Sequence, residues 1–191
     1  MKTITTCLIL AFLFSQIKAQ EQPSIRTHLK GFTIVFPGIE AAVEFPLASW
    51  KLGKEKGSNL VLVAAPVLDF FSYRGNYNGL GLMAEINPKL KLSSGWTHEL
   101  YGGVGVLNAF LTGTTFELQS DGTFSERSAK LNQYFSLKFG FGFGKSIQIR
   151  EKVYLLGIRI GAREIRTPGY QITPEASIGL TIPLKSKDTE L

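Results

Sequence analysis

The clearest pattern in the chain is a strict alternation of residue type between positions 131 and 144. A period of two predicts a β-strand with one apolar face and one small or polar face. A helix would spread the phenylalanines around its circumference, and each interior glycine would cost it about 1 kcal/mol. The apolar face carries Leu131, Phe135, Leu137, Phe139, Phe141 and Phe143, with Gln133 as its one polar member, and the other face carries Asn132, Tyr134, Ser136, Lys138, Gly140, Gly142 and Gly144.

Similar alternation recurs along most of the chain, with no amphipathic helix between the alternating segments. It is regular over 38–47, 80–89, 153–164 and 171–184, and less regular over 25–36, 60–73 and 98–112. With 131–144, these segments predict eight strands. Glycine, proline and asparagine between them predict turns at Pro37 and Gly38, 75–79, 93–95 and 167–169.

The segment 113–130 has a pattern of its own. Phe116 and Leu118 flank Glu117, and the turn sequence Ser-Asp-Gly-Thr follows at 120–123. We expect a hairpin that continues two strands beyond the main body, and an irregular loop is the alternative.

Composition and the N-terminal residues indicate where the protein works. The chain has 191 residues, 44% of them hydrophobic and 19% charged, which suits a single folded domain. Lys2, the apolar run 8–14 and the small residue Ala19 predict a secretory signal peptide over 1–19, followed by one domain over 20–191. An N-terminal membrane anchor is the alternative, for which the apolar run is short.

Removal of residues 1–19 would change the candidate chemistry. The remainder has no cysteine, which excludes disulfides and cysteine-based metal sites, and its 19 basic and 15 acidic residues give a net charge of +4. That charge favours an anionic lipid surface. Because no basic cluster has interleaved aromatic residues, nucleic acid is not an expected partner.

The polar faces of the predicted strands bear on which side of the sheet is outside. They carry four acids and four bases, and buried charges must be paired. The glycines among them would leave room inside a narrow barrel. We therefore expect the polar face to fill the lumen and the apolar face to contact lipid; the alternative is a soluble exported lipid- or ligand-binding barrel with the apolar face inward. The predicted lumen charges are Glu40, Glu44, Glu85, Lys89, Lys138, Arg159, Arg163 and Glu175.

Aromatic residues are expected at both rims of the predicted barrel. The predicted topology puts Trp50 and Trp96 at one rim and Tyr73 and Tyr170 towards the other, as interface aromatics of a membrane barrel.

Four prolines fall inside predicted strands, where each removes a backbone donor. We expect them at bulges or at strand ends near the rims; they are Pro46, Pro66, Pro88 and Pro174.

Taken with the signal peptide, three segments resemble a known family: 37–40 (Pro-Gly-Ile-Glu), 139–144 (Phe-Gly-Phe-Gly-Phe-Gly) and 174–182. Over roughly 25–184 the chain is similar to the small outer-membrane β-barrels of the OmpA/OmpX type. The resemblance implies an all-β fold, a closed eight-stranded antiparallel up-and-down transmembrane β-barrel in the bacterial outer membrane. It implies outer-membrane lipids as partners and a structural or surface-interaction role such as adhesion. A protein partner would contact the 113–130 hairpin.

Catalysis is the remaining alternative, as a lipid-modifying outer-membrane enzyme. The only histidines, His28 and His98, are expected near one rim, where Ser24, Ser93 and Ser94 are candidate nucleophiles. The simpler interpretation makes them solvated rim residues, and the carboxylates structural partners of arginine. The sequence contains no phosphate loop, metal-spaced cluster or nucleophile elbow, so we expect no enzyme activity, no cofactor and no metal.

Overall fold

The structure is a computed structural model that describes residues 22–32, 36–52, 57–73, 77–111, 115–127, 131–150, 152–166 and 170–184. The predicted signal peptide, 1–19, lies outside these residues. No helix among the described residues has the length and hydropathy needed to cross a membrane.

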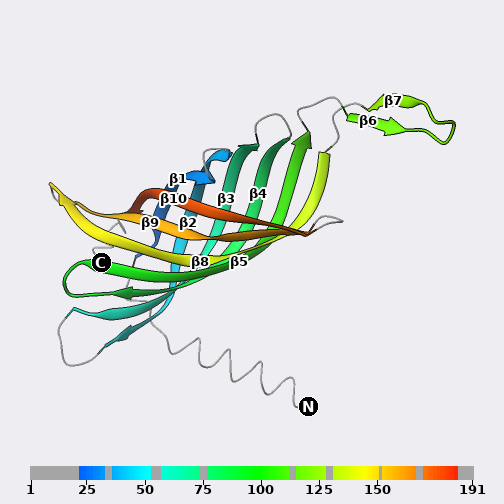
Figure 1. The fold of residues 1–191 in the computed structure, drawn as a ribbon. Coiled ribbons are helices and arrows are strands. Elements are labelled where there is room, and N and C mark those ends of the chain that lie inside the picture. Colours follow the sequence, from blue (N-terminus) through cyan, green and yellow to red (C-terminus); the bar gives the residue numbers. More distant parts are fainter. Residues whose placement is uncertain are drawn as a thin grey trace, which may run out of the picture.

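Eight antiparallel strands close into a barrel in the order β1-β10-β9-β8-β5-β4-β3-β2, and two short strands, β6 and β7, form a separate ribbon (Figure 1). The predicted fold class is confirmed, because each barrel strand pairs with its neighbours along the chain and β1 pairs with β10 to close the ring. The strands are β1 (Ser24–Phe32), β2 (Phe36–Lys51), β3 (Asn59–Tyr73), β4 (Tyr77–Lys91), β5 (Trp96–Leu111), β6 (Thr115–Leu118), β7 (Phe124–Arg127), β8 (Leu131–Ile149), β9 (Lys152–Arg166) and β10 (Tyr170–Pro183).

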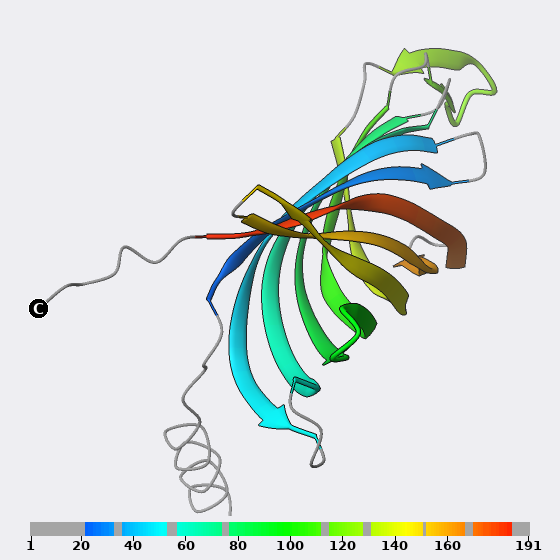
Figure 2. The same cartoon turned by 90° about the vertical axis from the view of Figure 1, so that its left-hand side faces the viewer.

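The barrel has two distinct ends. The near rim is where β2 ends and β3 begins, where 92–95 connects β4 to β5, and where β8 ends and β9 begins; both ends of the described chain, Gln22 and Leu184, lie there too. At the far rim β1 meets β2, β3 meets β4 and β9 meets β10. There too the chain leaves β5, forms the β6–β7 ribbon and returns as β8, so that the ribbon projects away from the barrel (Figures 1 and 2).

The turn predicted at Pro37 and Gly38 is wrong, because both lie in β2, and the turn predicted at 75–79 is too long, because β4 already begins at Tyr77; positions 75 and 76 lie outside the described residues. Gly38 lies within β2, opposite Phe71 of β3, and Gly79 lies within β4, opposite Phe71 on its other side. A Cβ at Gly38 would come within 2.8 Å of the Cβ of Phe71, and one at Gly79 within 2.5 Å of its ring. Glycine at both positions makes room for this buried phenylalanine. Pro37 also lies in β2, opposite Gly31.

The strand prolines occupy different kinds of position. The register of β2 against β3 shifts between Pro46 and Ala48, which is the expected bulge. Pro66, by contrast, lies in the middle of β3 opposite Ala84, so the expectation of a bulge or a rim position fails there. Pro66 has no N–H, and the β2–β3 pairing is interrupted between Ala42↔Val67 and Phe45↔Ala64.

Pro88 and Pro174 also lie within strands. Pro88 is opposite Leu62 of β3, and the β4–β5 pairing is interrupted between Ile86 and Lys89. Pro174 pairs in register with Ala162 of β9.

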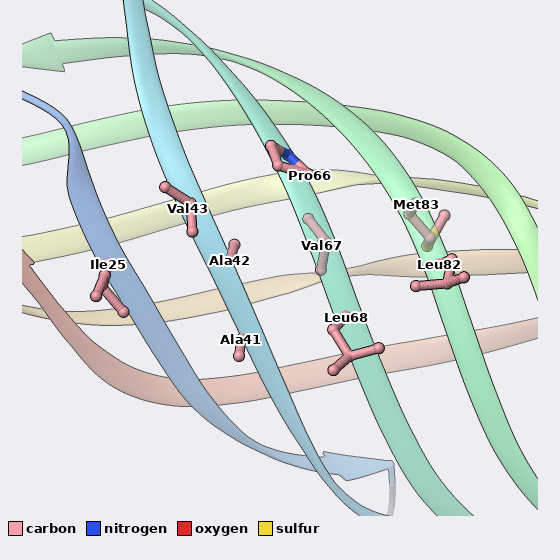
Figure 3. A pocket seen from close by; sticks show the side chains of 9 residues that line it. All are labelled: Ile25, Ala41, Ala42, Val43, Pro66, Val67, Leu68, Leu82 and Met83. Carbon is pink, nitrogen blue, oxygen red and sulfur yellow. The ribbon is translucent and has the colours of Figure 1, made fainter.

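Burial alternates along the strands with the apolar side outward. On β8, Phe139, Phe141 and Phe143 are 59%, 42% and 46% exposed, whereas Lys138, the residue before Phe139, is 4% exposed. The outer wall over β1–β4 also has an open apolar hollow of about 550 Å³, with Ala41 and Pro66 between larger side chains such as Leu68 (Figure 3). The arrangement with the phenylalanines inside, which a soluble barrel would need, is therefore not the one this chain adopts.

Candidate functional site: charges inside the barrel

The lumen holds twelve charged side chains among the described residues. Strand alternation turns every second side chain inward, and the twelve charged ones among them are buried. Each of these residues is at most 5% exposed except Glu99, whose side chain is 11% exposed. Six are basic and six acidic, so their formal charges cancel. They are Arg26, Lys30, Lys89, Lys138, Arg159 and Arg163, with Glu40, Glu44, Asp69, Glu85, Glu99 and Glu175.

The centre of the network is Glu85 on β4. Its carboxylate accepts hydrogen bonds from Arg26 at 2.7 Å, from Lys138 at 3.0 Å and from Arg159 at 3.1 Å. The same three cations, from β1, β8 and β9, also bond to Glu40 on β2. Two carboxylates and three cations thus tie five strands together across the lumen.

The network continues towards both rims. On the near side Lys89 donates to both oxygens of Glu44 at 2.8 Å and lies 3.3 Å from Glu99. On the far side Asp69 accepts from Lys30 and from Arg163. Charges buried in a low-dielectric interior are costly unless paired and hydrogen-bonded, and each of these carboxylates has at least two cationic neighbours.

Tyr101 of β5 packs against the cations of the network. Its ring centroid lies 4.1 Å from the guanidinium carbon of Arg159 and 5.3 Å from the Nζ of Lys138. Gly140 and Gly161 pair across β8 and β9 beside its hydroxyl, and a Cβ on Gly140 would come within 2.5 Å of that oxygen. These glycines leave room for the tyrosine.

All the lumen charges named from the sequence lie in this network: Glu40, Glu44, Glu85, Lys89, Lys138, Arg159, Arg163 and Glu175. Sequence reasoning missed Arg26, Lys30, Asp69 and Glu99. A usable signal was present at Arg26 and Lys30, which alternate with apolar or small residues on β1. Asp69 and Glu99 are the only acids in β3 and β5, and a lone carboxylate in an otherwise apolar strand needs a buried partner.

The predicted interface aromatics can be placed in part. Trp50 and Trp96 lie at the near rim and are 46% and 47% exposed. The Nζ of Lys145 lies 5.1 Å from the centroid of the Trp96 ring and donates to the Ser94 carbonyl at 2.6 Å. Tyr73 and Tyr170 lie at the far ends of β3 and β10, and their side chains fall outside the described residues.

The two histidines do not form a shared site. His28 is not solvated at a rim: it is 4% exposed inside the barrel, with Nδ1 2.9 Å from the Oγ of Ser177 rather than near Ser24. His98 packs on the outer face against Phe143, with ring centroids 5.3 Å apart. The void beside His28 holds about 10 Å³, which leaves no room for a substrate.

The described residues include no group of three His, Cys, Asp or Glu side chains arranged to hold a metal ion. The carboxylates predicted as structural partners of arginine include Glu40, Glu44 and Glu175, and each lies within 3.4 Å of at least one basic group. They have the surroundings of structural ion pairs.

The β6–β7 ribbon exposes apolar side chains beyond the far rim. Phe116 is opposite Glu126, Phe124 is opposite Leu118, and the two phenylalanines are 63% and 72% exposed. Asp121 in the turn accepts hydrogen bonds from the hydroxyl and the backbone N–H of Thr123. These bonds hold the pKa of the Asp121 carboxyl below its usual value.

Comparison with known proteins adds little to this description. No protein-family model matches the chain, and no curated protein matches its sequence. Among solved structures, the chain is similar to the N-terminal β-barrel domain of Pseudomonas aeruginosa OprF, with a TM-score of 0.44 and 10% identity over 86% of this chain and 100% of that one. It is similar also to Neisserial surface protein A, with a TM-score of 0.41 and 11% identity over 85% of this chain and 95% of that one. Neither likeness is close enough to carry a conclusion about function.

Proposed function

We propose that the protein is a bacterial outer-membrane β-barrel, exported by the signal peptide at 1–19, with a structural or surface-interaction role. The observation that carries this proposal is the inverted burial: large apolar side chains cover the outside, and twelve charges fill the inside. In water this distribution would expose the apolar surface and bury the ions. In a bilayer, lipid tails meet the apolar wall and the charges pair away from them.

The length of the apolar wall supports the same proposal. On β8 the outward residues are apolar from Phe135 to Phe143, with Gln133 and Lys145 as the polar residues that flank them. Nine positions fit the roughly 9–11 residues that a tilted strand needs to cross the hydrocarbon core. Gln133 bonds to Asn108 at 3.3 Å at one boundary, and Lys145 contacts Trp96 at the other.

In this proposal the near rim, where both ends of the described chain lie, faces the periplasm. The β6–β7 ribbon then projects from the cell surface. Because the ion pairs and Tyr101 fill the lumen, the barrel would not act as a wide solute pore.

We expect the protein expressed with its signal peptide to sediment with outer-membrane vesicles and to resist extraction with sodium carbonate. Unheated detergent samples should migrate differently from boiled ones on a gel, because a closed barrel stays folded until heated. Recovery in the aqueous periplasmic fraction, with no heat-dependent shift, would contradict the membrane proposal.

The surface-interaction role is assigned to the β6–β7 ribbon. It combines two exposed phenylalanines with two unpaired strand edges, since β6 and β7 pair only with each other. A two-stranded ribbon offers its backbone groups to an added strand. The proposed partner is a protein that contacts this ribbon.

A photoreactive benzoyl-phenylalanine at Phe124 should form a discrete protein cross-link in intact cells, whereas the same group at Phe139 should not. Deleting residues 114–128 should leave the heat-dependent gel shift intact, because neither β6 nor β7 pairs with the barrel. If benzoyl-phenylalanine forms no protein cross-link in intact cells when placed at Phe116 or at Phe124, the partner role is wrong.

A further inference from the structure

The hairpin formed by β8 and β9 extends beyond the rest of the near rim. The pairing of β5 with β8 ends at Trp96↔Lys145, and the pairing of β10 with β9 ends at Thr181↔Leu155. Past these points β8 and β9 pair only with each other, up to Ile149↔Lys152. Residues 146–149 therefore project by about 13 Å, at 3.3–3.4 Å a residue, at the end opposite the β6–β7 ribbon (Figure 1).

The edge of β9 in this extension presents unpaired backbone groups. Antiparallel ladders direct alternate residues to opposite neighbours. The N–H of Ser146 on β8 points away from β9, since it donates to the Gly95 carbonyl at 2.8 Å. Ser146 is opposite Leu155, so Leu155 and, two residues before it, Val153 direct their N–H and C=O groups away from β8. Leu155 meets Thr181, whereas no described strand pairs with Val153 on that side.

This edge borders a cavity. A space of about 350 Å³ opens at the near rim, lined by apolar side chains that include Val63, Trp96, Val153 and Leu155. Its polar lining includes the Lys89–Glu44 ion pair, whose groups already bond to each other. An extended segment added along β9 would direct every second side chain towards this apolar lining.

Basic side chains predominate among the described residues around the extension. Outside the lumen, every charged side chain among the described residues of the near rim is basic: Lys51, Lys91, Lys145, Arg150 and Lys152. Arg150 and Lys152 lie at the tip of the hairpin and are exposed. A docked strand with acidic side chains between its apolar ones would meet this charge.

We propose that the near-rim edge of β9, at 152–154, binds an extended acidic segment of another protein by strand addition, with alternate apolar side chains in the adjoining cavity. This site lies at the opposite end of the barrel from the β6–β7 ribbon. It depends on the fold and the near-rim charges, and not on the role proposed for that ribbon.

The test uses the full mature chain in detergent and two fluorescent probes, nine-residue peptides of alternating valine and glutamate or alternating valine and lysine. Fluorescence anisotropy should show saturable binding of the glutamate peptide and at least about tenfold weaker binding of the lysine peptide. Val153→Pro should weaken binding of the glutamate peptide about tenfold, the effect of losing one or two backbone hydrogen bonds.

Val153→Thr is the matched control, because it keeps the backbone N–H and the branched shape; it should bind as the unaltered chain does. Lys152→Glu should reduce the preference for the glutamate peptide, because four of the five basic side chains remain. The heat-dependent gel shift checks that each variant is folded. Equal binding by folded Val153→Pro and the unaltered chain, equal affinity for both peptides, or no saturable binding would each overturn the proposal.

Discussion

Replacing Glu85 with glutamine should lower the free energy of unfolding by about 3–5 kcal/mol, the usual cost of removing one partner from a buried ion pair. The Glu85 carboxylate has a 0% exposed side chain and accepts from Arg26, Lys138 and Arg159. Glutamine fills nearly the same volume but removes the negative charge. Three buried cations would then share Glu40, and the six acids of the lumen would become five.

Urea unfolding in lipid vesicles, followed by the heat-dependent gel shift, measures this change. Glu126→Gln on the exposed β7 strand is the control, and should stay within about 0.5 kcal/mol of the unaltered chain. Combining Glu85→Gln with Lys138→Met restores the charge balance. The double variant should therefore be more stable than the sum of the single effects predicts. Strict additivity, or a loss no larger than that of Glu126→Gln, would show that the network contributes little to stability.

Arginine in place of Phe139 should destabilise the membrane-embedded barrel by about 2–4 kcal/mol, as expected for a cation facing lipid at the bilayer midplane. Phe139 is 59% exposed and lies at the middle of the apolar wall of β8. Its partner on β5, Gly102, has no side chain that could shield a charge. If water and not lipid surrounded this position, replacing Phe139 with arginine would cost almost no stability.

Ile149→Arg is the matched control for this prediction. Ile149 belongs to the same strand and the same face, and is 54% exposed, but lies at the tip of the near-rim extension beyond Lys145. It should change stability by no more than about 0.5 kcal/mol. Both variants are measured by urea unfolding in vesicles of the same lipid. Equal effects at the two positions would mean that lipid does not surround Phe139.

Regular alternation made the fold predictable where it was present. Over 135–143 of β8 and 154–160 of β9 every second residue is large and apolar, so strand, face and neighbour all follow from the pattern. At 113–130 the sequence predicted a hairpin that continues two barrel strands, from Phe116, Leu118 and the turn sequence after them; β6 and β7 lie within that range but form a sheet of their own. On β3, where both faces are apolar, the sequence could not say which side was inward, and Asp69 was missed.

Local sequence signals gave wrong predictions at positions whose role depends on contacts between strands. Gly38 and Gly79 have the composition of turns, yet both accommodate Phe71, a contact between strands that no local window contains. His28 was expected in water near a rim, but its position on β1 opposite Glu40 turns it into the lumen. Pro66 could not be distinguished in sequence from a proline at a bulge.

The sequence by itself determined the eight strands, their order around the ring and the separation of apolar from charged faces, because a period of two assigns each residue to a face wherever the pattern is regular. Only the tertiary structure decided which charges meet. Glu85 contacts cations from three strands distant in the chain, and closure of the ring sets those pairings. Closure likewise sets where the β8–β9 hairpin outruns its pairing with β5 and β10, since strand stagger is a property of the whole barrel.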